Sequence, residues 1–163
     1  MTLEEFAATI ENRGGERATE GQLLAFEKKL GKTLPADYRT FLGISGGGMI
    51  FEPPVAYLDA PGRDLLLRHM NSLAEVEKNF AKPSSYPLPE GLLVIGNDAG
   101  GNSIMLCVTQ DRYGQIFMLD HEMVAYEGDP EPLDEAEENG LITQYSQSFS
   151  QFVSDMRIDD DDE

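Results

Sequence analysis

The histidine best placed for chemistry is His121, which lies between two carboxylates in the run Asp120-His121-Glu122. A histidine beside a carboxylate can act as a general base, because the carboxylate orients the ring and stabilises its charged form. In an extended strand, however, Asp120 and Glu122 would share one face and His121 the other. The run then lacks an orienting partner, so a small hydrolase that uses His121 is a distant third among the functional hypotheses.

Metal-binding residues are scarce in the chain. Its two histidines, His69 and His121, and its single cysteine, Cys107, stand at intervals that match no recognisable metal-site spacing. Cys107 also lies in the apolar run 104–108, where a buried thiol behaves as a small hydrophobic side chain. We therefore expect no bound metal and no cysteine nucleophile.

Glycine clusters at 46–48 and 96–101 are the remaining candidates for a ligand site. A phosphate-binding loop needs a lysine after its glycines, and no Lys or Arg occurs between Lys82 and Arg112. Glycine also serves tight turns, in which the backbone adopts a positive φ. The clusters therefore predict turns, and we expect neither a cofactor nor enzymatic activity.

The acidic residues are concentrated in the second half of the chain. Residues 1–82 hold twelve acids and ten bases, whereas residues 83–163 hold eighteen acids and two bases. Such a charge distribution repels nucleic acids and anionic membranes and attracts basic proteins. We expect a protein partner and neither nucleic acid nor a membrane, although the acidity is also consistent with a role in solubility alone.

The length of 163 residues suits one domain. We expect that domain to span residues 1–158, followed by a disordered acidic tail at 159–163. No apolar run approaches the roughly 18 residues of a membrane span, and acids stand where a signal peptide begins with basic residues. A lone cysteine forms no internal disulfide, which agrees with a cytoplasmic location. The sequence leaves the oligomeric state open.

Hydrophobic periodicity predicts helices at both ends of the chain and strands between them. The helices are expected at 3–12, between Thr19 and Gly31, from Pro35 to Leu42, at 72–80 and at 149–156. The strands are expected at 49–51, 55–58, 65–67, 92–95, 104–108, 116–119 and 124–126. Residues 127–138 hold seven acids and read as a solvated loop. The order predicts an α+β domain whose closing helix packs on a meander formed by residues 92–119.

A specific assembly of residues lies near the N-terminus. Phe26-Glu27 and Leu30-Gly31 precede the run 34–42, Leu-Pro-Ala-Asp-Tyr-Arg-Thr-Phe-Leu, and then Ser45-Gly46-Gly47. These residues resemble the signature of the SUKH superfamily, the Smi/Knr family, which runs F-E-x-x-L-G-x-x-L-P-x-D-Y-x-x-F-L and then N-G-G. The motif positions that we expect to be structural are Leu34, Pro35, Tyr38, Phe41, Leu42, Gly46, Gly47, Gly100 and Gly101.

The resemblance continues downstream and covers about residues 20–155. Residues 95–102 are similar to the second glycine motif of the family, residues 114–121 to its next strand, and residues 148–152 to its closing helix. The chain departs from the family at Ser45, where asparagine is usual, and at Asn102, where aspartate is frequent. Both replacements keep short polar side chains that suit turns.

The resemblance implies an α+β fold with a mostly antiparallel sheet flanked by helices. It also implies a non-enzymatic protein, because the bacterial members look like immunity proteins that neutralise polymorphic or contact-dependent toxins, many of them nucleases. Fungal relatives regulate cell-wall synthesis, so the alternative hypothesis is an intracellular regulatory scaffold that binds a cellular partner.

The leading hypothesis is therefore a cytoplasmic immunity protein that binds a basic toxin domain. The acids that we expect to contact this partner are Asp98, Asp120, Glu122, Glu127 and Asp129. The first lies in a glycine-rich turn, the next two near a strand end, and the last two in the acidic segment. The sequence does not identify the toxin.

Overall fold

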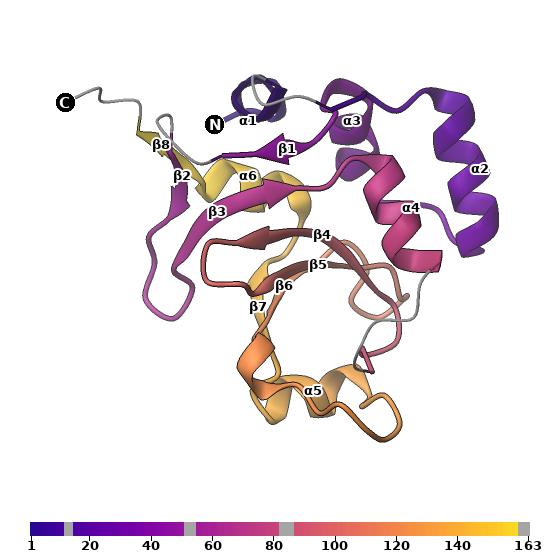
Figure 1. Cartoon of the computed structure of the whole chain (residues 1–163), viewed down its shortest axis with the longest axis vertical. Coiled ribbons are helices and arrows are strands. Elements are labelled where there is room, and N and C mark those ends of the chain that lie inside the picture. Colours follow the sequence, from indigo (N-terminus) through magenta and orange to yellow (C-terminus); the bar gives the residue numbers. More distant parts are fainter. Residues whose placement is uncertain (12–14, 51–54, 82–86, 160–163) are drawn as a thin grey trace.

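The computed structural model describes residues 1–11, 15–50, 55–81 and 87–159, and its helices lie at the ends of the chain and between strands (Figure 1). The helices are α1 (Leu3–Glu11), α2 (Glu20–Leu30), α3 (Ala36–Ile44), α4 (Leu73–Ala81), α5 (Leu133–Glu138) and α6 (Phe149–Asp155), with a 3-10 turn η1 at His121–Met123. Within these ranges no helix has the length and apolarity that a membrane span requires.

The strands form one curled antiparallel sheet. They are β1 (Gly48–Met49), β2 (Val55–Leu58), β3 (Leu65–Met70), β4 (Leu92–Asp98), β5 (Ser103–Cys107), β6 (Ile116–Leu119), β7 (Ile142–Ser146) and β8 (Arg157–Asp159). Their spatial order is β7-β6-β5-β4-β3-β2-β8, and β1 also pairs with β3. The meander β4-β5-β6 that the sequence predicts lies between β7 and β3 in this order.

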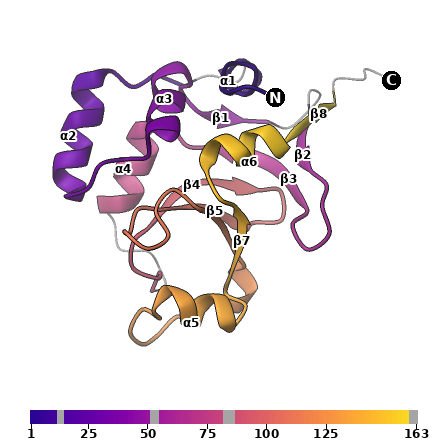
Figure 2. The same cartoon turned by 180° about the vertical axis from the view of Figure 1, so that it is seen from behind.

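The two faces of the sheet support two separate cores, because successive side chains of a strand point to opposite faces. Ile104 and Leu106 join the larger core, which is shared with Phe6, Phe41 and Phe149 of α1, α3 and α6. Their neighbours in β5, Met105 and Cys107, join a smaller core that α5 covers through Ala136. Figure 2 shows α5 on the side of the sheet opposite to these three helices.

The α+β class, the closing helix and the helical N-terminus are confirmed, but the prediction for residues 124–138 is wrong in two respects. Residues 124–126 form no strand, because Val124 packs on the smaller core as part of the irregular segment after η1. Residues 133–138 are a helix rather than loop, since Leu133 and Ala136 bury one face of the turn that begins after Pro132.

The sequence did not predict the two outermost strands. β7 and β8 lie at opposite ends of the strand order. Asp159 is the last residue of β8, paired with Val55, so the expectation that it belongs to a disordered tail is wrong for this residue. The pairing with β2 extends the sheet to this point. Residues 160–163, and Asn12 and Phe51 of the predicted elements, lie outside the described residues.

The carboxylate of Glu27 joins α2 to α3. Its Oε2 accepts a hydrogen bond from the backbone N–H of Leu34 at 2.8 Å, and its Oε1 accepts one from Nε of Arg39 at 3.0 Å. Arg39 also donates to both carboxylate oxygens of Glu20, at 2.7 and 2.9 Å. These bonds raise the pKa of Arg39 and lower the pKa of Glu20. The glutamate of the N-terminal motif is therefore a structural residue.

Asp37 connects α3 to the closing helix. Its Oδ1 accepts from the backbone N–H of Tyr38 and its Oδ2 from the backbone N–H of Ser150, both at 2.8 Å. The ring of Tyr38 is fully buried and packs edge-on against Phe149 at 5.1 Å between centroids. Two motif residues thus fix α6 against α3.

The glycines at 46 and 47 allow two backbone segments to touch. A Cβ atom on Gly46 would lie 2.3 Å from the carbonyl carbon of Gly15, and one on Gly47 would lie 2.5 Å from the carbonyl oxygen of Met70. Gly47 also has a φ of +73°, which favours glycine. The positive φ of Gly47 agrees with the turn that the sequence predicts, whereas the close packing of the two backbone segments was not predicted.

Replacing Glu27 with Ala should lower the free energy of unfolding by about 3 kcal/mol, because it removes two hydrogen bonds of a carboxylate whose side chain is 10 % exposed. Glu27→Gln keeps an acceptor for Leu34 and should cost about 1 kcal/mol. Urea denaturation measures both values. The control is Glu77→Ala, which removes an exposed ion pair with Lys29 and should cost under about 0.5 kcal/mol. Equal losses for Glu27→Ala and the control would contradict this role.

Candidate protein-binding surface

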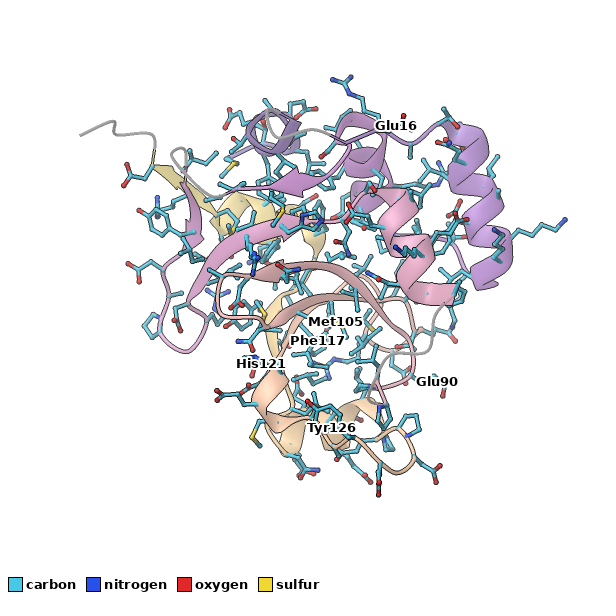
Figure 3. All side chains as sticks on the ribbon, viewed as in Figure 1. Glu16, Glu90, Met105, Phe117, His121 and Tyr126 are labelled. Atoms are coloured by element: carbon cyan, nitrogen blue, oxygen red, sulfur yellow. The ribbon has the colours of Figure 1, made fainter. Side chains whose placement is uncertain are left out.

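Residues 120–138, named here the acidic lobe, form the layer that covers the smaller core. The lobe contains η1, the irregular segment 124–132 and α5, and it holds nine Asp and Glu residues and no Lys or Arg. Val124, Leu133 and Ala136 attach it to the sheet. In Figure 3, Met105 and Phe117 lie between the sheet and α5, and Tyr126 lies beside α5. The lobe is thus an acidic layer held by a small apolar contact.

Arg112, in the hairpin between β5 and β6, contacts the lobe. Its guanidinium donates to both oxygens of Glu137 at 3.0 and 3.3 Å and to Asp134 at 3.5 Å, and it lies 4.9 Å from the ring centroid of Phe117. The hydrogen bonds with Glu137 are the main cause of the raised pKa of Arg112. Among the described residues, these are the ion pairs of the lobe. Most of its negative charge therefore remains uncompensated.

The glycine-rich turn between β4 and β5 holds the beginning of the lobe. Oδ1 of Asp98 accepts from the backbone N–H of Asn102 at 2.8 Å, which closes the turn. Oδ1 of Asn102 in turn accepts from the backbone N–H of His121 at 3.1 Å and contacts its Nδ1 at 2.7 Å. Gly101 has a φ of +93°, and a Cβ atom there would touch the His121 ring at 3.6 Å. Two of the sequence motifs are thus in direct contact.

The geometry around His121 is that of an oriented surface histidine. The oxygen of Asn102 already accepts a backbone N–H, so the ring nitrogen that it contacts must be a donor, and neutral His121 carries its proton on Nδ1. Asp120 uses Oδ1 to accept the backbone N–H of Glu122 at 2.9 Å, not to orient the ring. Across the described part of the chain, no three His, Cys, Asp or Glu residues form a group suited to a metal ion.

The five acids that the sequence singles out occupy different environments. Glu122, Glu127 and Asp129 are exposed on the lobe, and Asp120 is half-buried at its start. Asp98 is 9 % exposed and its carboxylate closes the turn. The lobe therefore displays three of the five acids, and the surface proposed below does not include Asp98.

Sequence reasoning did not identify two apolar side chains on the same surface. Met123 is 52 % exposed and Tyr126 is 69 % exposed, and both lie between exposed acids. The sequence analysis placed Tyr126 in a strand, which implied partial burial. The available signal was the absence of a helical or alternating period around these residues within a strongly acidic segment. Large exposed apolar side chains within a polar surface are typical of protein-binding sites.

We expect Asn102→Ala to change the tautomer of His121, because the alanine removes the acceptor that holds the proton on Nδ1. The measurement is the pair of ring ¹⁵N chemical shifts of the neutral His121 ring. Wild type should give the Nδ1–H pattern and the alanine variant a mixture. Asn102→Asp keeps an acceptor oxygen and should give the same pattern as wild type. An Nε2–H pattern in wild type would contradict the assignment of the proton to Nδ1.

Comparison with known proteins matches the chain to a family model. The model of the SMI1 / KNR4 family (SUKH-1) matches residues 17–155, which include the N-terminal motif, the glycine-rich turn and the closing helix. No curated protein and no solved structure matches the chain significantly. The resemblance found in the sequence is confirmed by the family model. The chain belongs to the SMI1 / KNR4 family (SUKH-1).

Proposed function

We propose that this chain is an immunity protein that neutralises a toxin domain by covering a basic surface of the toxin with the acidic lobe. Membership in the SMI1 / KNR4 family supports an immunity-type or protein-binding role in general. The observation that carries the finer proposal is the lobe itself, which exposes Glu122, Glu127 and Asp129 around the apolar side chains of Met123 and Tyr126.

The charge of the lobe suits a partner that binds nucleic acid. A nuclease domain carries Lys and Arg at its substrate site because it must bind phosphates. An acidic surface is attracted to such a site over distances of the order of the Debye length, which is about 10 Å at 0.1 M salt. Since Arg112 pairs only with Asp134 and Glu137 among the described acids of the lobe, the exposed acids of the segment 122–129 remain available for this attraction. A nuclease toxin is therefore the partner that we propose.

Complementary charge raises the association rate and orients the partner more than it raises affinity. The affinity therefore needs the apolar residues. Tyrosine supplies a large contact area with few rotatable bonds, and methionine adapts to irregular surfaces. Met123 and Tyr126 are three residues apart on one segment and both are exposed. We assign them the central contacts of the interface, with the acids as its rim. Neutralisation would occur in the cytoplasm, where such a toxin meets nucleic acid.

The partner to be tested is any toxin domain found encoded beside the gene for this chain. Reversing the charge of the lobe should slow binding to that domain. In the variant Glu122→Lys, Glu127→Lys, Asp129→Lys, the association rate at about 0.05 M salt should fall at least about tenfold, because the steering field is lost. For wild type the rate should fall as salt rises towards about 0.5 M. Stopped-flow or surface binding measures both.

The matched control is Glu4→Lys, Glu16→Lys, Asp59→Lys, which changes the net charge equally at exposed positions outside the lobe. This control should retain most of the wild-type rate. Equal rates for the lobe variant and wild type at low salt would refute the electrostatic interface. If the protein encoded next to this chain bound to it and kept its own toxicity, the regulatory scaffold would be favoured instead.

Truncating the apolar residues should weaken the complex. We expect Tyr126→Ala to raise Kd by about 30-fold, which corresponds to about 2 kcal/mol, and Met123→Ala to raise it by a smaller factor. Leu24→Ala is the control, since Leu24 is 56 % exposed on α2 and outside the lobe. Titration calorimetry measures the three values. Unchanged Kd for both lobe variants would show that these residues lie outside the interface.

A further inference from the structure

We propose that Met123 is a site of reversible oxidation: a hydroperoxide converts its thioether to the sulfoxide, and the sulfoxide weakens the binding of a partner at the acidic lobe. The effect on binding rests on the proposed function, whereas the site of oxidation does not. Met123 is the last residue of η1, and its side chain is 52 % exposed. Figure 3 shows His121 and Tyr126, which lie on either side of it in the chain, on the side of the molecule away from α1 and α3.

Burial separates Met123 from the six other methionines of the chain. An oxidant must reach the sulfur atom, so a buried methionine reacts only when the structure opens. Met1 and Met49 are half-buried. The remaining four lie in the two cores and are at most 5 % exposed: Met70, Met105, Met118 and Met156. Met123 is therefore the methionine that an oxidant in solution reaches most easily.

The single cysteine does not compete for the oxidant. Cys107 is 0 % exposed in the smaller core, and its Sγ lies 3.0 Å from Oγ1 of Thr109. Oxidation of a thiol needs both the thiolate form and access for the oxidant, and the burial of Cys107 removes that access. The folded chain should therefore react with an oxidant at the thioether of Met123 before it reacts at a thiol.

The charge of the acidic lobe selects the class of oxidant. The lobe holds nine Asp and Glu residues and no Lys or Arg, so it repels anionic oxidants such as hypochlorite but not an uncharged hydroperoxide. In the reaction, the S–O bond forms as the O–O bond of the hydroperoxide breaks. The departing oxygen takes the proton of the transferred oxygen and leaves as water or an alcohol. The sulfur loses two electrons and the hydroperoxide gains them, so the step needs no further reactant.

The sulfoxide should change the surface of the lobe without unfolding it. The hydrogen bonds of η1 do not use the side chain of Met123: its backbone N–H donates to the carbonyl of Asp120 at 3.1 Å, and Oδ1 of Asp120 accepts from the N–H of Glu122. Its side chain belongs to neither of the two cores of the described chain. The new oxygen is polar, and burying a polar group in an interface without a donor is unfavourable. Oxidation should therefore weaken partner binding while the free protein stays folded.

The first test locates the site of oxidation and needs only this chain. The full chain is treated with an excess of hydrogen peroxide, and peptide mass spectrometry follows the sulfoxide at each methionine over time. We expect Met123 to react at least about tenfold faster than the four core methionines, because their sulfur atoms are buried. The urea midpoint of the protein oxidised at Met123 should equal that of untreated protein. Equal rates at Met123 and the core methionines, or a faster reaction at Met1 or Met49, would overturn the assignment of the site.

The second test measures the Kd for the toxin domain of the binding experiments above, before and after peroxide treatment of this chain. Oxidation of wild type should raise Kd about tenfold, because the sulfoxide places a polar oxygen in the interface. Met123→Leu has no thioether at this position, so treatment should change its own Kd by less than about twofold. Met49→Leu is the matched control, since it removes a half-buried thioether outside the lobe and should lose affinity on treatment as wild type does.

Reduction of the oxidised protein tests reversibility. The two reductases that act on the two sulfoxide epimers, with a dithiol as the reductant, should restore the Kd of untreated wild type. An unchanged Kd after complete oxidation of Met123, or an equal loss of affinity in Met123→Leu, would overturn the effect on binding. If untreated protein does not bind the toxin domain at all, the proposed function fails, and the mass spectrometry still decides whether Met123 is the site of oxidation. The two proposals therefore fail separately.

Discussion

The rest of the structure depends on the buried carboxylate of Glu27, which holds the backbone of Leu34 and the guanidinium of Arg39 at the same time. A buried carboxylate must have all its oxygens satisfied, so α2, the following turn and α3 can adopt only the arrangement that supplies both donors. In the turn between α2 and α3, the carbonyl of Thr33 accepts a hydrogen bond from the hydroxyl of Tyr113. α3 in turn places Asp37 at the start of α6, where it accepts from the N–H of Ser150. One local constraint thereby connects the N-terminal helices to a hairpin of the sheet and to the closing helix.

Elements with strong local signals were predictable from the sequence. Thr19 and Gln22 form the predicted capping box, Gly31 ends α2 in the left-handed conformation, and the apolar runs 92–95, 104–108 and 116–119 all contribute to strands. β8 was not predictable, because Arg-Ile-Asp has no apolar pattern and becomes a strand only by pairing with β2. α5 has two apolar residues among its acids, Leu133 and Ala136. Their burial stabilises the helix only because other segments form the core that they contact.

The candidate surface shows the same division between local and distant causes. The charge of residues 120–138 is a property of the sequence, so its sign and place were predictable. Which side chains it displays depends on packing against the smaller core: the turn closed by Asp98 withdraws that carboxylate from solvent, while Tyr126 stays exposed because Val124, Leu133 and Ala136 make the contact with the sheet. Residue spacing alone does not predict which of several neighbouring side chains will be buried.

The separation of the two cores has a consequence for how one fold can bind different partners. The residues of the N-terminal motif and of the closing helix act on the helical face of the sheet, where a change affects the larger core. The second glycine motif differs, because Gly101 and Asn102 contact His121 at the start of the acidic lobe. The acidic lobe lies over the smaller core, on the side of the sheet opposite to α1, α3 and α6 (Figure 2). Substitutions at exposed positions such as Glu127 or Tyr126 therefore leave the bonds of Glu27 intact. That independence is the physical condition under which one architecture can change its binding surface without losing stability.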